Sequence, residues 1–127
     1  MDEWTAPVAF EQVDGYAVFR LAGEFTLAAG VDRISAAIAE ANAQRLSRLM
    51  IVITETTGYG VPTLSMRLAM MRAFADAAHG YVRAVIVCRR ELIDPHKFGV
   101  TMAANFGMTA NVFDNEPEAV AWLRELA

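Results

Sequence analysis

Leu49-Met50-Ile51-Val52-Ile53 is the stretch of this chain that decides its fold. Five apolar residues in a row are too few for a buried helix, and such a run is typical of a central strand covered on both faces. A second strand of this kind is expected from Val82 to Cys88, where the residues after Arg83 are again all apolar. Because two such strands need helices on both sides of their sheet, the sequence predicts an α/β domain.

The residues before the central run predict an antiparallel hairpin and a helix. The segments Val8 to Val13 and Tyr16 to Leu21 are rich in β-forming residues, and Asp14-Gly15 between them suits a two-residue turn. Thr26 is a good helix cap, and apolar residues recur after it at spacings of three and four as far as about Gln44. We therefore expect one helix between the hairpin and the central strand.

Three more helices and one strand are expected after the central run. The second helix should run from Thr63 to Ala78. Its expected core face is made of four residues: Leu64, Leu68, Met71 and Ala75. Asp94-Pro95 should start a third helix that Gly107 ends. A last strand, Ala110 to Phe113, and a fourth helix capped by Asn115 complete the chain.

The order of elements is β-β-α-β-α-β-α-β-α, which predicts a mixed five-stranded sheet with an N-terminal hairpin and helices packed on it. At 127 residues, the chain is expected to be one domain, residues 1–127. In sheets of this kind the functional crevice usually lies outside the carboxyl ends of the parallel strands. That location corresponds here to Thr54 to Thr63 and Arg89 to Lys97.

Composition and charge argue against several kinds of partner. A formal net charge of -4 gives no basic field, so neither nucleic acid nor an anionic membrane surface is expected. Met1-Asp2-Glu3-Trp4 lacks the features of a signal peptide, and no apolar run approaches the roughly 18 residues of a membrane span. We expect a cytoplasmic protein without stable membrane anchoring. The one cysteine, Cys88, lies in an apolar run that predicts an inert buried thiol.

The sequence contains no recognisable catalytic or metal-binding set. His79 and His96 have no second histidine, cysteine or carboxylate at a metal-ligand spacing, and no serine lies in a Gly-x-Ser-x-Gly turn. An enzyme with Glu55 or His96 as general base would need an acid–base pair that the spacing does not show. We therefore predict a non-enzymatic protein that needs no metal or cofactor and works by binding.

Five residues at the predicted carboxyl edge are candidates for a switch or a contact surface. Thr63 and Ser65 lie in the first turn of the second helix, where a phosphate would gain from the helix dipole; capping and solvation are the alternative roles. Arg89 and Arg90 offer planar donor groups to a carboxylate or phosphate, with a solvated loop as the alternative. Glu55 lies at the same edge and opposes anion binding there.

Seven methionines are many for a chain of this length. Met66, Met70 and Met71 lie on the second helix, and Met102 and Met108 flank the third. They fill the core, line a ligand cavity or form an adaptable contact surface, and the sequence leaves these three roles open.

Several segments resemble the STAS-type domains of the SpoIIAA-like group, also described as STAS/SEC14-like, which includes the anti-sigma factor antagonists. Besides the central run, three segments carry the resemblance: Leu21-Ala22-Gly23-Glu24-Phe25-Thr26, Ala84-Val85-Ile86-Val87, and Val112-Phe113-Asp114-Asn115-Glu116-Pro117-Glu118-Ala119-Val120-Ala121-Trp122-Leu123. The resemblance implies a SpoIIAA-like fold and a regulatory domain switched by phosphorylation of a serine that follows an aspartate. The matching register here reads Val61-Pro62-Thr63-Leu64-Ser65, so Thr63 is the nearest positional equivalent.

Two functions remain as expectations. The resemblance implies a regulatory module that acts through a protein partner, such as a kinase-type regulator, with the edge from Glu55 to Ser65 as its contact surface. The SEC14-like side of the resemblance implies instead a carrier or sensor of a small apolar or lipid-like ligand. A homodimer is a further expectation, because exposed strand edges and helix faces of small mixed sheets often pair.

Overall fold

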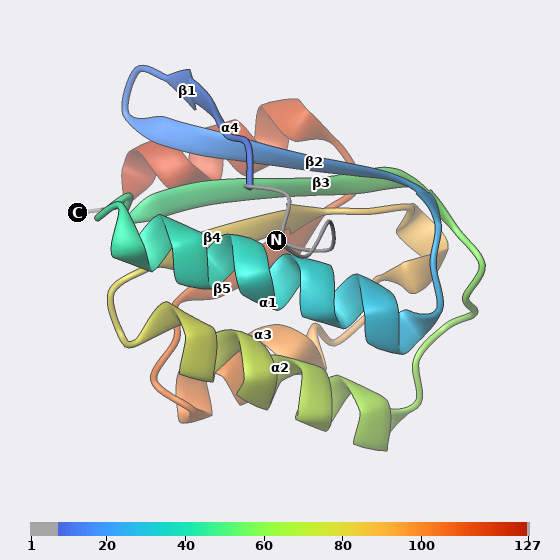
Figure 1. Cartoon of the computed structure of the whole chain (residues 1–127). Helices are drawn as coiled ribbons and strands as arrows, with labels where there is room; N and C mark the ends of the chain where they lie inside the picture. The colour runs from blue at the N-terminus through green and yellow to red at the C-terminus, as the bar shows by residue number, and fades with distance from the viewer. Residues whose placement is uncertain (1–7, 127) are drawn as a thin grey trace, which may run out of the picture.

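The computed structural model describes residues 8–126, which form a five-stranded sheet and its covering helices (Figure 1). Strand β1 (Glu11–Val13) is antiparallel to β2 (Tyr16–Glu24). Strands β3 (Arg48–Thr57), β4 (Arg83–Val87) and β5 (Ala110–Phe113) then follow in chain order, each parallel to its neighbour. The expected mixed sheet with an N-terminal hairpin is confirmed. The expectation drawn from residues 1–4 lies outside the described residues.

The strand order explains where the helices lie. Because the parallel strands succeed one another in one direction, right-handed crossovers put all three connecting helices on the same face. These are α1 (Leu27–Ala43), α2 (Leu64–Ala78) and α3 (Phe98–Asn105), and α4 (Glu116–Glu125) covers the other face (Figure 1). No helix in the part of the chain described here is long and apolar enough to cross a membrane.

The central strand supplies both cores. Leu49 and Ile51 pack against the layer of α1, α2 and α3, whereas Met50 and Val52 pack against α4. All four side chains are at most 5% exposed. The continuous apolar run is therefore the two-sided strand that the sequence predicted.

Three helix starts follow the expected caps. The Thr26 hydroxyl accepts the Ala29 N–H at 3.1 Å, and the Thr63 hydroxyl accepts the Met66 N–H at 3.2 Å. The Asn115 side chain accepts the Glu118 N–H at 3.0 Å. These bonds satisfy backbone donors that a helix leaves free in its first turn, so the capping residues fix where α1, α2 and α4 begin.

Strand bounds differ from expectation at the hairpin and at the carboxyl edge. β1 begins at Glu11 rather than Val8, and β2 and β3 continue to Glu24 and Thr57. The extension is paired, because Ala22 to Glu24 face Glu55 to Thr57. Between the pairs Arg20–Val52 and Ala22–Glu55, β3 contains one residue more than β2, which is a β-bulge.

The third helix begins later than the Asp94-Pro95 signal predicted. Asp94 does accept backbone N–H groups, from His96 and Phe98 at 3.0 Å each. Lys97, however, adopts a left-handed conformation with φ 50°, so the helix can begin only at Phe98. The carboxylate therefore caps a turn that precedes the helix, and a 3₁₀ turn at Arg90–Leu92 fills the space before it. Gly107 follows the helix with φ 86°, as expected for a helix end.

The expected core face of α2 was wrong in its first half. Leu64 is 59% exposed and Leu68 is 46% exposed. The buried residues of the helix are Phe74, Ala75 and Ala78. The helix carries two overlapping apolar stripes, and the one that includes Phe74 and Ala78 faces the sheet. The start of α2 lies at the outer edge of the helical layer (Figure 1), which leaves both leucines in solvent.

Replacing Leu123 by alanine should lower the free energy of unfolding by about 2–5 kcal/mol, because this side chain is fully buried between α4 and the sheet. Leu64→Ala should change it by less than about 0.5 kcal/mol, because the side chain is mostly exposed. Urea denaturation followed by circular dichroism gives both values. Equal losses in the two variants would contradict the assignment of Leu64 to the surface.

Candidate functional site

A cavity of about 120 Å³ lies between the helical layer and the sheet, close to the carboxyl ends of the strands. It receives residues from both segments that the sequence indicated, among them Thr56 at the end of β3, Tyr59 after it, and Leu92 and Asp94 after β4. Both segments that were expected at the carboxyl ends of the strands therefore contribute to the cavity. The cavity lies under the helices and not at a reversal of the strand order, because the order of the described parallel strands does not reverse.

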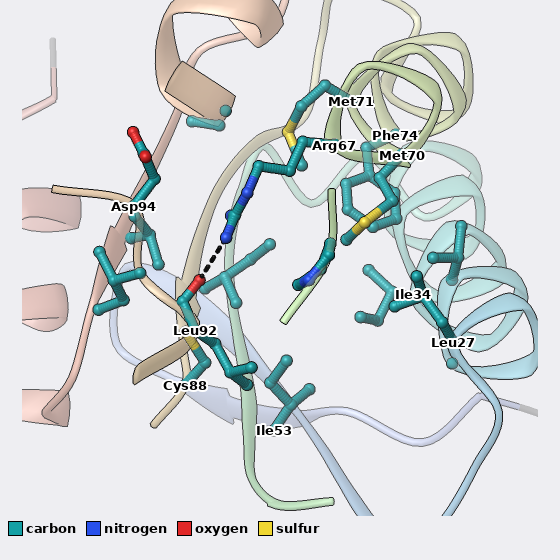
Figure 2. Close-up of a pocket in the computed structure, with 18 of the residues that line it drawn as sticks. Leu27, Ile34, Ile53, Arg67, Met70, Met71, Phe74, Cys88, Leu92 and Asp94 are labelled. Atoms are coloured by element: carbon teal, nitrogen blue, oxygen red, sulfur yellow. Dashed lines mark hydrogen bonds between the residues drawn. The ribbon is translucent and has the colours of Figure 1, made fainter. Parts of the chain in front are cut away.

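The walls of the cavity are mostly apolar. Figure 2 shows Leu27 and Ile34 on α1, Met70 and Phe74 on α2, and Ile53 on β3 around the same space. Met71 lies beside them, so two of the seven methionines line the cavity. Met108 is buried in the core and Met66 is 47% exposed. Methionines thus lie in the core, in the cavity wall and on the surface.

Arg67 is the charged residue that sequence reasoning missed. It follows Thr63 by one helical turn and shares a face with Met70, Met71 and Phe74, so it enters the cavity wall with them. Its guanidinium donates a hydrogen bond of 3.2 Å to the Leu92 carbonyl (Figure 2). The sequence signal for Arg67 is a charged residue within an otherwise apolar stripe of α2. This signal can be recognised only when the stripe that includes Phe74 is known to be the buried one.

Asp94 and Lys97 add two charges to the cavity wall. The Asp94 carboxylate is held by the N–H groups that precede α3. The Lys97 ammonium donates to the Asn111 side chain at 2.9 Å and lies 4.4 Å from the centre of the Phe113 ring. Of the charged residues after β4, Asp94 and Lys97 therefore belong to the cavity wall, whereas Arg89, Arg90 and Glu91 do not line it.

The bulge in β3 determines which polar side chain at the carboxyl edge faces the helices. Thr56 is 2% exposed, lines the cavity and donates to the Ile53 carbonyl at 2.7 Å. Its hydroxyl also shares a hydrogen bond with the Tyr59 hydroxyl. Glu55, the residue that the sequence singled out, is exposed and does not line the cavity.

Gly58 fixes the loop that follows β3. It has φ 98°, and a side chain there would meet the Phe25 carbonyl oxygen at 2.6 Å. The Phe25 N–H donates to the Thr57 carbonyl at 2.8 Å, which ties the two strand ends together. Glycine is therefore required at position 58 for two reasons, the positive φ and this close approach.

The other four candidates lie at the carboxyl edge but outside the cavity. Thr63 and Ser65 are exposed in the first turn of α2, and Thr63 acts as its cap. Arg90 is 87% exposed and bonds to Asp114 at 2.8 Å, while Arg89 lies 3.6 Å from Glu91. Within residues 8–126, no hydrogen bond or ion pair joins either arginine to Thr63 or Ser65.

Exposed apolar residues gather on the start of α2. We define the α2 surface as the large apolar side chains around its first two turns that are between 46% and 59% exposed: Val61, Leu64, Met66 and Leu68. Arg67 lies on the same two turns, between the exposed residues Met66 and Leu68, and is half-buried. The α2 surface and the cavity thus lie on opposite sides of the same two helical turns.

Among the described residues, no three of the side chains that commonly hold metal ions come together. Cys88 lines the cavity and is 4% exposed. Burial raises the pKa of its thiol to about 11, and the Arg67 guanidinium opposes this shift without overcoming it. The thiol is therefore neutral near pH 7, which agrees with the expected inert role.

The architecture is an α/β fold with a mixed sheet, three helices on one face and one on the other. It is the SpoIIAA-like fold, which confirms the expectation from the sequence. A protein of the DUF3478 family from Shewanella loihica PV-4 with a SpoIIAA-like fold is similar over 92% of this chain and 92% of its own, with 20% identity and a TM-score of 0.51.

The anti-sigma factor antagonist SpoIIAA in its unphosphorylated form matches over 93% of this chain and 98% of its own, with 23% identity and a TM-score of 0.47. No family model matches the sequence, and no curated protein does so significantly.

Iodoacetamide should label Cys88 in the folded protein far more slowly than in urea, because the thiol is buried and protonated at neutral pH. The pKa of the Cys88 thiol in the folded state lies above the ordinary value of 9.0, so the folded protein favours the neutral thiol. The contribution of this preference to the free energy of unfolding is complete below pH 9 and is lost as the pH rises towards 11. Mass spectrometry of timed samples measures the labelling rate at each pH. Equal rates in folded and unfolded protein at neutral pH would contradict this assignment.

Proposed function

We propose that this chain is a non-enzymatic, cytoplasmic regulatory module that binds a protein partner through the α2 surface. The observation that supports it is the row Val61, Leu64 and Leu68, in which Leu64 and Leu68 lie one turn apart on the same side of α2 and Val61 precedes the helix cap. A row of this kind is how a helix inserts into an apolar groove of another protein. Met66 widens the surface with a side chain that adapts its shape.

The energetics favour a partner over permanent exposure. Completing the burial of a half-exposed leucine contributes on the order of 1 kcal/mol to the free energy of binding. The three side chains of the row together therefore make a substantial contribution to the affinity of a complex. Large apolar side chains that gather on a surface usually mark an interaction site, whereas scattered ones do not.

Thr63 and Ser65 border the α2 surface and are our proposed switch. A phosphate on either hydroxyl would lie at the helix N-terminus, where the dipole favours negative charge, and would put that charge beside an apolar contact row. The partner class that this implies is a kinase-type regulator. Glu55, Arg89 and Arg90 are proposed as polar contacts around the same edge.

A second function has its own supporting observation, the cavity. Its volume of about 120 Å³ is well below the roughly 300 Å³ at which pockets for drug-sized ligands begin, which favours a ligand smaller than a lipid. Apolar cavities of about 150 Å³ can hold a molecule of the size of benzene. The carrier or sensor alternative is therefore proposed for a small apolar molecule.

Leu68→Glu should reduce capture of the partner by roughly 10-fold, because the complex would then bury a charge within the apolar contact. The tagged full chain is used as bait in extract of its own host, and the recovered protein is quantified by mass spectrometry. Val13→Glu is the matched control, since Val13 is also an exposed apolar residue but lies on β1. Its capture should equal that of the unchanged chain.

The same assay tests the rest of the edge. Alanine at Thr63 and Ser65 and charge reversal at Arg89 and Arg90 should each weaken capture while the circular dichroism spectrum stays the same. Sedimentation of the purified chain shows whether the partner is a second copy, in which case Leu68→Glu converts a dimer to a monomer. Full capture by all of these variants would rule out the α2 surface as the contact.

A further inference from the structure

The cavity combines an apolar interior with one guanidinium. Arg67 is half-buried in the wall, and the rest of its helical face is apolar. Figure 2 shows its side chain crossing the space from α2 towards the chain after β4, with Met71 and Phe74 on the same helix beside it. A charge in such surroundings interacts more strongly with an opposite charge than it would in water.

The guanidinium retains most of its hydrogen-bonding capacity. It donates one bond to the Leu92 carbonyl, and an arginine has five N–H donors. Within residues 8–126, no carboxylate lies within ion-pair distance of it. The cationic side chain of Arg67 is therefore neutralised by no neighbour in the described protein.

The nearest acidic residue of the wall is occupied elsewhere. Asp94 directs its carboxylate to the N–H groups of His96 and Phe98, and Figure 2 shows it turned away from Arg67. Lys97, the other cation of the wall, bonds to a neutral amide. With two cations and one engaged carboxylate, the mouth of the cavity favours an anion.

We infer that the cavity binds a small carboxylate with a compact apolar body, such as a six-membered ring or a short branched chain. The body fills the space between Ile34, Ile53 and Phe74, and the carboxylate pairs with the planar N–H groups of Arg67. A cavity of about 120 Å³ sets the limit on the body. This inference rests on the second proposed function and names its ligand class.

A carboxylate fits better than a phosphate on the basis of charge. A phosphate monoester carries nearly two negative charges and three acceptor oxygens, which require several donors. Arg67 offers one planar set of N–H donors, and the Lys97 ammonium already donates a hydrogen bond to Asn111. One guanidinium matches one carboxylate with two parallel hydrogen bonds.

The test is a titration of the ¹⁵N-labelled full chain with four probes, followed by NMR. Benzoate and 4-methylpentanoate are the carboxylates, benzyl alcohol is the neutral analogue and phenyl phosphate is the competing anion. We expect at least one carboxylate to shift the signals of Arg67, Leu92 and Met70 with saturation, and to bind roughly 10-fold more tightly than benzyl alcohol. Arg67→Met should remove this preference for the anion.

Arg72→Met is the matched control. Arg72 lies on the same helix, stacks on the Phe106 ring at 4.5 Å and does not line the cavity, so its removal should leave carboxylate binding unchanged. If Arg67→Met does not fold, Arg67→Lys is the second variant. It keeps the positive charge but lacks the planar pair of N–H donors, so it should weaken carboxylate binding measurably.

Each contrary outcome overturns a different statement. Equal affinity for benzoate and benzyl alcohol would refute the carboxylate class but leave a small-ligand site. Tighter binding of phenyl phosphate would replace the carboxylate by a phosphoryl group. Failure of all four probes to bind would refute both this inference and the proposed carrier or sensor function.

Discussion

The burial of β3 on both faces is the constraint on which the rest of the structure depends. Alternate side chains of one short run belong to different cores, Leu49 and Ile51 to one and Met50 and Val52 to the other. Neither face can be left in water, because each strand residue here contributes roughly 1–3 kcal/mol through burial. Three crossover helices cover one face because the strand order never reverses, and α4 must therefore cover the other.

The candidate site follows from that arrangement. With three helices on one face, the middle helix α2 extends to the outer edge of the layer, and its first turns have the sheet on one side and solvent on the other. The inner side holds Arg67 at a cavity, and the outer side displays Leu64 and Leu68. The two proposed binding sites thus share one segment, and a molecule in the cavity would contact the same helix turns as a bound partner. That connection gives a sensor a physical basis.

Most of the fold could be predicted from the sequence, and much less of the site. Buried strands and caps such as Thr63 and Asn115 depend on local composition and periodicity, and these signals are strong. The face of α2 was misjudged because two stripes overlap, and the start of α3 because a left-handed Lys97 is invisible in the pattern. Arg67 and Thr56 were missed because their positions depend on that helix face and on a bulge between strands distant in sequence.

The central claim is that this protein holds another molecule, without covalent chemistry, at the edge where α2 meets the cavity. The most direct measurement compares the mass of the chain purified from its own host under native and denaturing conditions. We expect added mass in the native spectrum, from a partner or a small molecule, that is lost on denaturation. A chain of the same bare mass in both spectra would contradict it.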